Sequence, residues 1–377
     1  LLFIFPTHAL LASPQILTNT QSINAPTICS KSFIQHNLPH ITTISTERKK
    51  IFAGVGSALG VNDLDNDGDI DIVLANLDGP SAILWNQGNL IFEKQELSVQ
   101  NTRAINIIDV NADSWLDIVF THPGNPPSLW LSSNLSGTLE FTKTDQFGVW
   151  HVLNAMAWAD LDLDGDLDMV GASYDGEIAE FYDGFVIGGG VAYYENNEGI
   201  FQAHELGRYA HALALLLTDL NEDNYLDIIV GNDFELPDHT WIWTTDGWHI
   251  VNIFEQMPRN TMSLAAADID NDGQMELFAA DMKPYSSDNA TVYAWQELAE
   301  NHDKLPEGDP QIEENILLKK DKSGKFINQA RLSGVDASGW SWSAKFGDLD
   351  NDGMLDLYVV NGMYSESTFS HLVGSEL

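Results

Sequence analysis

A nine-residue aspartate-rich pattern recurs six times along the chain, and no other feature of the sequence constrains the fold as much. The copies begin at residues 63, 109, 160, 219, 268 and 348, so successive starts are 46, 51, 59, 49 and 80 residues apart. Each copy has acidic or amide residues at positions 1, 3, 5 and 9 and apolar residues at positions 2 and 8. Repetition at a period of about 50 residues predicts a fold assembled from one supersecondary unit.

The flanks of the repeats predict strands on both sides of each loop. Residues 72–76, 118–122, 169–173, 228–232, 277–281 and 357–361 are short runs rich in apolar and β-branched residues that end in a polar residue, and apolar runs such as 104–108 and 212–217 precede the loops. Residues 82–92, 191–201 and 316–327 have the pattern of hairpins. Four strands per unit predict an all-β protein, a β-propeller of six recognisable four-stranded blades, with six or seven at closure. Each aspartate-rich loop should join the first two strands of its blade.

The spacing of the copies also predicts a domain organisation. The longest interval indicates an insertion at residues 282–314, between the second and third strands of the fifth blade, with helical composition at 290–300. A smaller Gly-rich insertion is expected at 175–190, at the same place in the third blade. The propeller is predicted to span residues 32–377, and residues 32–38 resemble an outer strand that would close the final blade.

Acidic residues are concentrated in the repeated loops. The chain has 56 Asp and Glu against 17 Lys and Arg, a formal net charge of -39, and 25 of the acidic residues lie in the six nonapeptides. Such a chain repels nucleic acid and anionic membranes at long range and attracts cations. A general solubilising coat would be spread more evenly, so the concentration favours cation-binding sites.

The spacing of the oxygen-bearing side chains predicts calcium. Carboxylates at positions 1, 3 and 5 converge when the backbone turns tightly, which requires a positive φ at position 6. Position 7 would offer its backbone carbonyl, and position 9 a closing carboxylate. Six or seven oxygens at about 2.3–2.6 Å suit Ca²⁺ better than Mg²⁺, and the lack of His and Cys at these positions disfavours zinc and copper. The alternative, acidic turns without a metal, would leave clustered carboxylates that repel one another.

Up to six Ca²⁺ ions are therefore expected, one in each loop. The predicted ligand positions are Asp63, Asp65, Asp67, Asp69 and Asp71; Asp109, Asn111, Asp113, Trp115 and Asp117; Asp160, Asp162, Asp164, Asp166 and Asp168; Asp219, Asn221, Asp223, Tyr225 and Asp227; Asp268, Asp270, Asp272, Gln274 and Glu276; and Asp348, Asp350, Asp352, Met354 and Asp356.

The same spacing opens an EF-hand loop, but the EF-hand interpretation fails. An EF-hand needs Glu at position 12 and helices on both sides, whereas position 12 here is apolar or Gly in every copy and the flanks are strand-like. The second copy should bind calcium most weakly, because it has Ser114 at the turn, where Gly is preferred, and Asn111 in place of a carboxylate.

The loops on strand-like flanks resemble the FG-GAP/VCBS repeats of integrin α-chain propellers and of many secreted bacterial proteins. Residues 326–335, 339–342 and 346–362 are similar to the ASPIC/UnbV (cartilage acidic protein-like) branch. The resemblance implies a ring of roughly six to eight blades, most often seven, with calcium loops on the face opposite the usual ligand face. It also implies adhesion, matrix or polysaccharide contact. Members of that branch commonly carry a further C-terminal domain, so the chain is interpreted as a fragment.

The N-terminal residues indicate export. Residues 1–13 have the apolar core and small-residue end of a signal-peptide remnant, too short to span a membrane; a buried N-terminal strand is the alternative. Residues 14–31 form a predicted linker, and the single Cys29 excludes an intrachain disulfide. The protein is expected to be secreted, periplasmic or at the cell surface, without membrane insertion.

The sequence favours a binding scaffold for an extracellular protein or polysaccharide over an enzyme. It has no nucleophile elbow, P-loop or zinc-protease motif, and its 11 His are scattered. The alternative is a polysaccharide lyase or hydrolase on a calcium-stabilised propeller, and a third interpretation is an architectural module of a larger surface protein. A lyase would need converging basic groups, for which Arg103, Arg208, Arg259 and Lys283 are candidates, while Trp241, Trp243 and Trp248 could stack on sugars.

Overall fold

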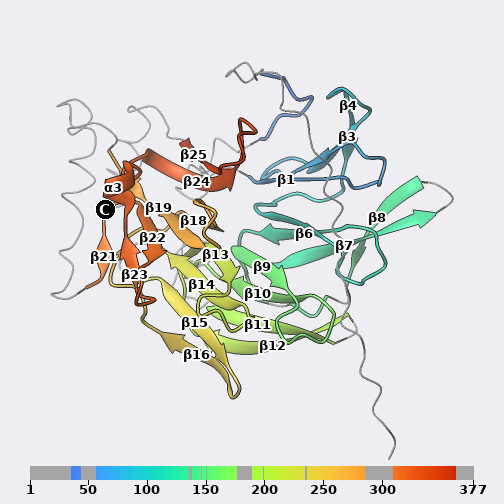
Figure 1. Cartoon of the computed structure of the whole chain (residues 1–377). Coiled ribbons are helices and arrows are strands. Elements are labelled where there is room, and N and C mark those ends of the chain that lie inside the picture. Colours follow the sequence, from blue (N-terminus) through green and yellow to red (C-terminus); the bar gives the residue numbers. More distant parts are fainter. Residues whose placement is uncertain are drawn as a thin grey trace, which may run out of the picture.

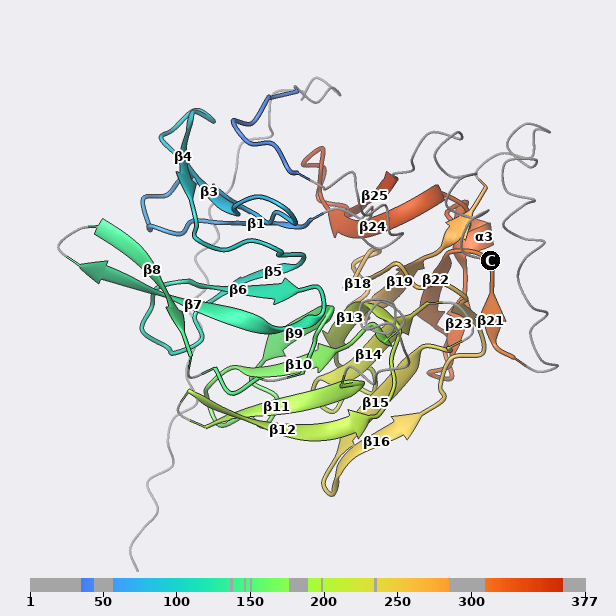
Figure 2. The same cartoon turned by 180° about the vertical axis from the view of Figure 1, so that it is seen from behind.

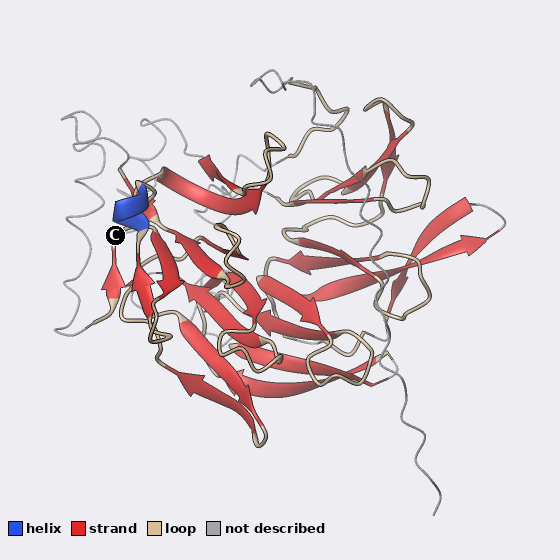
Figure 3. Ribbon diagram, viewed as in Figure 1, coloured by secondary structure: helices blue, strands red, loops and turns tan. Residues whose placement is uncertain are grey.

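The computed structural model describes residues 35–43, 57–135, 138–145, 147–149, 151–175, 189–197, 199–233, 236–284 and 309–361. These residues are almost entirely strands and the loops between them, with a single short helix, α3 (Ala330–Ser333) (Figure 3). The expected signal-peptide remnant, the linker and the helical composition at 290–300 lie outside the described residues. No helix in the described ranges is long and apolar enough to cross a bilayer.

Six antiparallel blades follow one another around a ring (Figure 1), as the sequence predicts. The first three consist of β1 (Leu59–Asn62), β2 (Asp71–Leu74), β3 (Ala82–Asn86) and β4 (Phe92–Glu96); β5 (Ile105–Ile108), β6 (Asp117–His122), β7 (Asn125–Leu135) and β8 (Thr138–Thr144); and β9 (Ala155–Ala159), β10 (Asp168–Ala172), β11 (Val191–Asn197) and β12 (Ile200–Gly207). The others consist of β13 (Ala212–Thr218), β14 (Asp227–Asn232), β15 (His239–Thr244) and β16 (Gly247–Val251); β18 (Ser263–Ala267), β19 (Glu276–Ala280), β22 (Ile316–Lys320) and β23 (Phe326–Asn328); and, in the sixth, β24 (Gly339–Gly347) and β25 (Asp356–Asn361).

Strand order within each blade places every aspartate-rich loop on one face of the ring. The loops join β1 to β2, β5 to β6, β9 to β10, β13 to β14, β18 to β19 and β24 to β25, as the repeats predict. The first strands of neighbouring blades contact one another, β9 with β13 and β13 with β18 among them. The connections between second and third strands therefore emerge on the opposite face. We call these two surfaces the loop face and the opposite face.

The hydrophobic core lies between consecutive blades and not inside any one sheet. Val73 and Ile83 of the first blade pack against Ile118 and Phe120 of the second, and four further clusters join the later blades in turn. Phe278 is fully buried between the fifth and sixth blades, a position at which burial of the side chain contributes about 1.5–3 kcal/mol. Apolar residues on both faces of each middle strand explain the continuous apolar runs of the sequence.

Two short strands lie between β19 and β22 in the sequence, and each pairs outside the sheet of the fifth blade. The strand β20 (Met282–Lys283) pairs with β24 of the sixth blade, and β21 (Gln311–Ile312) pairs in parallel with β17 (Met257–Pro258), which precedes the fifth blade. Figure 2 shows β21 beside the fifth blade, at the rim of the ring.

Residues 35–43 differ from the expectation that residues 32–38 supply an outer strand, because they form no strand. Thr43 instead lies against the first blade, where its backbone N–H donates to Asn76 Oδ1 at 2.9 Å and its carbonyl accepts from the Asp78 N–H at 3.2 Å. Residues 32–34 lie outside the described part of the chain, and a likeness in residue pattern to β12 does not specify a pairing partner.

Candidate metal-binding loops

The backbone of all six loops takes the same left-handed turn. Position 6 has a positive φ in every copy: Gly68, Ser114, Gly165, Asn224, Gly273 and Gly353. This confirms the predicted turn, including the copies without Gly. Position 4 also has a positive φ in every copy, namely Asn66, Ala112, Leu163, Glu222, Asn271 and Asn351. The sequence analysis missed this second turn, although Asn at three of the six positions, a residue that tolerates this conformation, was a signal for it.

The position-1 carboxylate organises each turn by accepting backbone hydrogen bonds. In the first loop, Asp63 Oδ1 accepts from the Asp67 N–H at 3.0 Å, and Asp63 Oδ2 from the Gly68 N–H at 3.0 Å. The same pair of bonds is present at Asp109, Asp219, Asp268 and Asp348, and the bond to position 6 at Asp160. The position-7 N–H in turn donates to the position-5 carboxylate in all six loops. These bonds direct the carboxylates inward.

In the first four loops the position-9 carboxylate is buried and joins its loop to the blade. Asp71 Oδ2 accepts from the Leu64 N–H at 3.0 Å, and Asp71 Oδ1 accepts from the Asn86 N–H at 2.8 Å in the third strand. Equivalent pairs of bonds are made by Asp117, Asp168 and Asp227. Desolvation raises the pKa of Asp117 and of Asp227 to about 6. The two backbone hydrogen bonds lower the pKa of each residue, and the negative charges of neighbouring loop carboxylates raise it further. The sequence analysis had assigned position 9 only to the metal.

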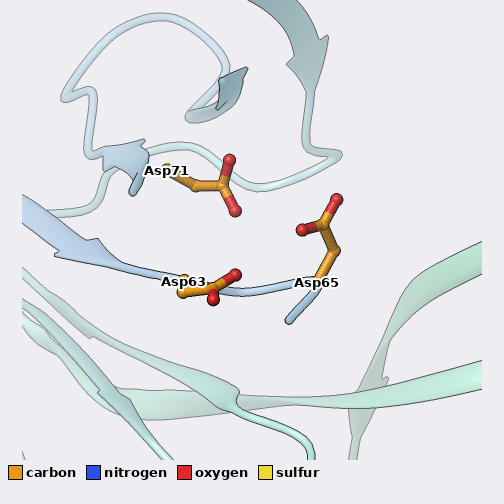
Figure 4. Close-up of side chains that lie close together, drawn as sticks. All are labelled: Asp63, Asp65 and Asp71. Carbon is orange, nitrogen blue, oxygen red and sulfur yellow. The ribbon is translucent and has the colours of Figure 1, made fainter. Parts of the chain in front are cut away.

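Acidic side chains converge in four of the six loops. Ligand atoms of each group lie within 4.8 Å of one another, and the groups are Asp63, Asp65 and Asp71; Asp160, Asp162 and Asp164; Asp268, Asp270 and Glu276; and Asp348, Asp350 and Asp356. Figure 4 shows the three carboxylates of the first loop directed toward a shared space. All the donors are oxygens, the ligand type that Ca²⁺ prefers.

In the second and fourth loops an amide group inside the loop donates a hydrogen bond to the position-5 carboxylate. Asn111 Nδ2 donates to Asp113 Oδ2 at 3.1 Å, and Asn221 Nδ2 donates to Asp223 Oδ2 at 2.9 Å. The amide group therefore takes the position-5 oxygen that would otherwise face a cation. Neither loop forms a group of three acidic ligands among the described residues.

The third loop fits a cation best. Asp160 Oδ1 is buried and has no hydrogen-bond partner within the described part of the chain. A buried carboxylate oxygen without a partner is unfavourable unless a cation compensates it. Desolvation raises the pKa of Asp162, and the negative charges of Asp164, Asp160 and Glu195 add to that effect. Glu195, on the third strand of this blade, is a nearby acid that the sequence analysis did not include.

The fifth loop contains an amino group among its carboxylates. Lys319 Nζ of β22 is 3.0 Å from Asp272 Oδ2 and 3.0 Å from Glu276 Oε1, and it also pairs with Asp270. The hydrogen bond from Lys319 lowers the pKa of Asp272. The sequence analysis did not single out Lys319, because the residue lies 43 positions after Glu276 and meets the loop only through the pairing of β19 with β22.

The opposite face has a small hollow between the second and third blades. Its lining consists of Arg103, Thr121, His122, Pro123, Gly124, Val152, Leu153, Asn154 and Tyr174. Arg103 Nη1 donates to Asn154 Oδ1 at 3.4 Å, and His122 Nε2 is 2.8 Å from Ser128 Oγ. The hollow thus combines a guanidinium group, an amide and an aromatic ring on the face away from the loops.

The other candidate ligand-face residues do not gather there. Arg259 is buried and pairs with Glu313 at 3.3 Å, whereas Lys283 pairs with Glu314 at 2.8 Å and with Asp336. Arg208 is on the exterior and pairs with Glu205. Of the three tryptophans, Trp241 is a core residue between the third and fourth blades, and Trp248 packs against the same cluster. Trp243 stands edge-to-face with Trp248, the ring centroids 5.0 Å apart.

A protein-family comparison agrees with this architecture. The family model of the FG-GAP-like repeat matches residues 109–171, which span the second and third loops, and residues 219–279, which span the fourth and fifth loops, with the strands between them. The chain contains FG-GAP-like repeats. The matched segments thus include four of the six loops and the strands that join them. No curated protein matches the sequence.

Two solved structures resemble parts of the chain. Saccharomyces cerevisiae Sqt1 matches with a TM-score of 0.43 and 13% identity over 77% of this chain, which spans 65% of that chain. BBS1N in complex with ARL6DN matches with a TM-score of 0.43 and 12% identity over 81% of this chain and 89% of that one.

Proposed function

We propose that the protein is a calcium-binding repeat protein that acts as a secreted or cell-surface scaffold for a protein or glycan ligand. Its FG-GAP-like propeller is a rigid framework that presents connections on two faces. The proposal assigns the loop face to Ca²⁺ and the opposite face to the ligand. It assigns no catalytic residues.

The observation that carries the calcium proposal is the buried Asp160 Oδ1, which lacks a hydrogen-bond partner and lies in a group with Asp162 and Asp164. A divalent cation would compensate this oxygen and offset the repulsion between the acids. Similar support comes from the first and sixth loops, which have carboxylate groups of the same kind. The second and fourth loops should bind more weakly, because an amide replaces the carboxylate at position 3.

Calcium would then act chiefly on stability. Free ligand at 100 times its dissociation constant adds about 2.7 kcal/mol for each site that exists only in the folded protein. Because the position-9 carboxylate of each of the first four blades also accepts a hydrogen bond from the third strand, ions in those loops would strengthen the blades themselves. Extracellular calcium modules bind at about 10⁻⁴–10⁻³ M, so this function suits an exported protein.

The hollow on the opposite face is the proposed point of ligand contact. A guanidinium group such as that of Arg103, which lines the hollow, binds carboxylates and sulfates with directed hydrogen bonds. In a chain with a net charge of -39, such a cation would favour an acidic sugar locally while the rest of the surface repels unrelated polyanions.

Two measurements test the proposal. Equilibrium dialysis should find several Ca²⁺ per chain, and the double variant Asp162→Asn/Asp164→Asn should bind one fewer, while the exposed Asp145→Asn should bind as many as the wild type. A glycan array with and without calcium should then show binding that Arg103→Gln weakens and the exterior Arg208→Gln leaves unchanged. The absence of bound calcium would disprove the metal assignment. Release of unsaturated or shortened oligosaccharides during incubation would favour the lyase or hydrolase instead.

A further inference from the structure

We propose that the fifth loop carries its own cation: the ammonium group of Lys319 takes the place that Ca²⁺ takes in the other carboxylate-rich loops, and this loop does not bind calcium. One amino group contacts all three of Asp270, Asp272 and Glu276. Asp270 and Glu276 are the same side chains that, with Asp268, make up the convergent acidic group of this loop. The inference rests on the calcium function proposed for the remaining loops.

The position of Lys319 follows from strand register. Leu277 pairs with Leu318 across β19 and β22, which places Lys319 opposite the position-9 residue Glu276. In the first four blades, the third-strand residues opposite position 9 are Trp85, Leu131, Glu195 and Ile242. Among these five described third strands, only the fifth blade has a cationic residue at this point, and the third blade has an additional acid. The two blades are therefore opposite in charge at equivalent positions.

Lys319 compensates the deepest carboxylate of the loop. Glu276 is 1% exposed, and its Oε2 accepts from the Ile269 N–H at 2.9 Å. Its other oxygen, Oε1, accepts no hydrogen bond of good geometry within the described residues, unlike Oε2, but the charge of Lys319 Nζ at 3.0 Å compensates it. In the first four blades, by contrast, both oxygens of the position-9 Asp accept from backbone N–H groups. The longer Glu side chain and the Lys are thus complementary substitutions within a single blade.

A calcium ion and this ammonium group exclude each other. Both would lie within a few ångströms of the same oxygens, where two positive charges repel strongly. Calcium would bind only after the four-carbon stem of Lys319 had moved its amino group away from three carboxylates, and the affinity would fall accordingly. A tethered cation needs no free ligand, so this loop keeps its turn at any calcium concentration. The blade that carries the long insertion is thereby independent of the metal.

Calcium counting on the full chain tests the inference directly. The double variant Asp270→Asn/Asp272→Asn should bind the same number of Ca²⁺ as the wild type, in contrast to Asp162→Asn/Asp164→Asn, which should bind one fewer. Lys319→Met should bind one more than the wild type. Lys94→Met is the matched control, because Lys94 is similarly exposed and pairs only with Glu96 within its own strand among the contacts of the described residues. A loss of one ion on replacing Asp270 and Asp272, or no gain on replacing Lys319, overturns the inference.

Thermal unfolding in excess chelator separates this inference from the calcium proposal. Without metal, Lys319→Met leaves three acids together and should lower the melting temperature by about 2 °C or more relative to Lys94→Met. Equal melting temperatures of the two variants in chelator would overturn the inference even if the protein binds calcium elsewhere. A wild-type protein that binds no calcium, with Lys319→Met still destabilised in chelator, would disprove the proposed function and leave the role of Lys319 intact.

Discussion

Asp71 Oδ2 accepts a hydrogen bond of 3.0 Å from the backbone N–H of Leu64, seven residues earlier in the chain. The two residues stand at opposite ends of the first loop, so this bond closes the loop whether or not a metal is present. Leu64 is itself fully buried. The loop is thereby fixed to the blade at its apolar residue and at its last carboxylate, and the acids between them are held in a common turn.

Replacing this carboxylate should destabilise the fold independently of calcium. In Asp71→Ala the backbone N–H groups of Leu64 and Asn86 lose their acceptor, and each buried unsatisfied group costs about 1–3 kcal/mol. We expect the free energy of unfolding, measured with urea in excess chelator, to fall by about 2 kcal/mol or more. Asp78→Ala, at an exposed position of the same blade, should change it by less than about 0.5 kcal/mol. Equal effects of the two variants would refute a structural role for position 9.

Removal of calcium should destabilise the blades whose loops bind it. Several acid groups would lose their counter-ion at once, and each saturated site contributes about 2.7 kcal/mol at 100 times its dissociation constant. We expect chelator to lower the melting temperature by at least about 5 °C, and added calcium, but not magnesium, to restore it. Differential scanning fluorimetry gives this measurement. A melting temperature that chelator leaves unmoved would count against metal in the loops.

The second loop should release its ion before the others and should improve with glycine at its turn. Ser114 has a φ of 73°, a conformation that is unfavourable by about 1 kcal/mol for a residue with a Cβ atom. Ser114→Gly should therefore raise stability in calcium by up to about 1 kcal/mol. It should also move the first step of a chelator titration to a higher chelator concentration. Asn224→Gly in the fourth loop is the matched comparison, with a smaller gain because Asn tolerates this conformation. If the second loop empties last, its ligand assignment is wrong.

The contribution of Asp281 to the free energy of unfolding should decrease as the pH rises. This fully buried side chain has its pKa raised by desolvation from 3.8 to about 7, although it accepts from the Arg259 N–H at 3.0 Å. The folded protein thus keeps a proton that the unfolded chain releases. The contribution of Asp281 is complete below pH of about 4 and is lost as pH rises toward about 7.

The variant Asp281→Asn cannot ionise and removes this dependence. We expect the stability advantage of the wild type over Asp281→Asn to shrink by at least about 1 kcal/mol between about pH 5 and pH 8. Urea unfolding at several pH values in chelator measures it, and the exposed Asp145→Asn should show no such trend. An advantage that grows with pH would reverse the sign and reject the assignment.

Local features of the sequence were enough to predict the architecture. Each loop carries its own turn signal and its own flanking strands, and both are read within about fifteen residues. The positive φ at position 6 was therefore predictable even for Ser114 and Asn224. The second left-handed residue, at position 4, was obscured because Ala112, Leu163 and Glu222 do not favour that conformation.

Features that depend on strand register were not predictable from the sequence. Whether Lys319 or Glu195 faces a loop is decided by which residue of the third strand pairs with position 10, and a shift of one residue would turn both side chains away. The hydrogen bond from Asn86 to Asp71 has the same origin. Residues 35–38, the described part of the expected strand at 32–38, form no strand for the related reason that a sequence pattern does not identify its pairing partner.

The pairings of β20 with β24 and of β21 with β17 hold the chain in place where it leaves the fifth blade after β19 and where it returns before β22. Residues 284 and 309 are the last and first described positions beyond these two pairings, and β18, β19, β22 and β23 form one antiparallel sheet. The segment between residues 284 and 309 is therefore a suitable place to insert foreign sequence. A foreign peptide or small module grafted there would be displayed at the rim of the ring, with both of its ends anchored by the propeller.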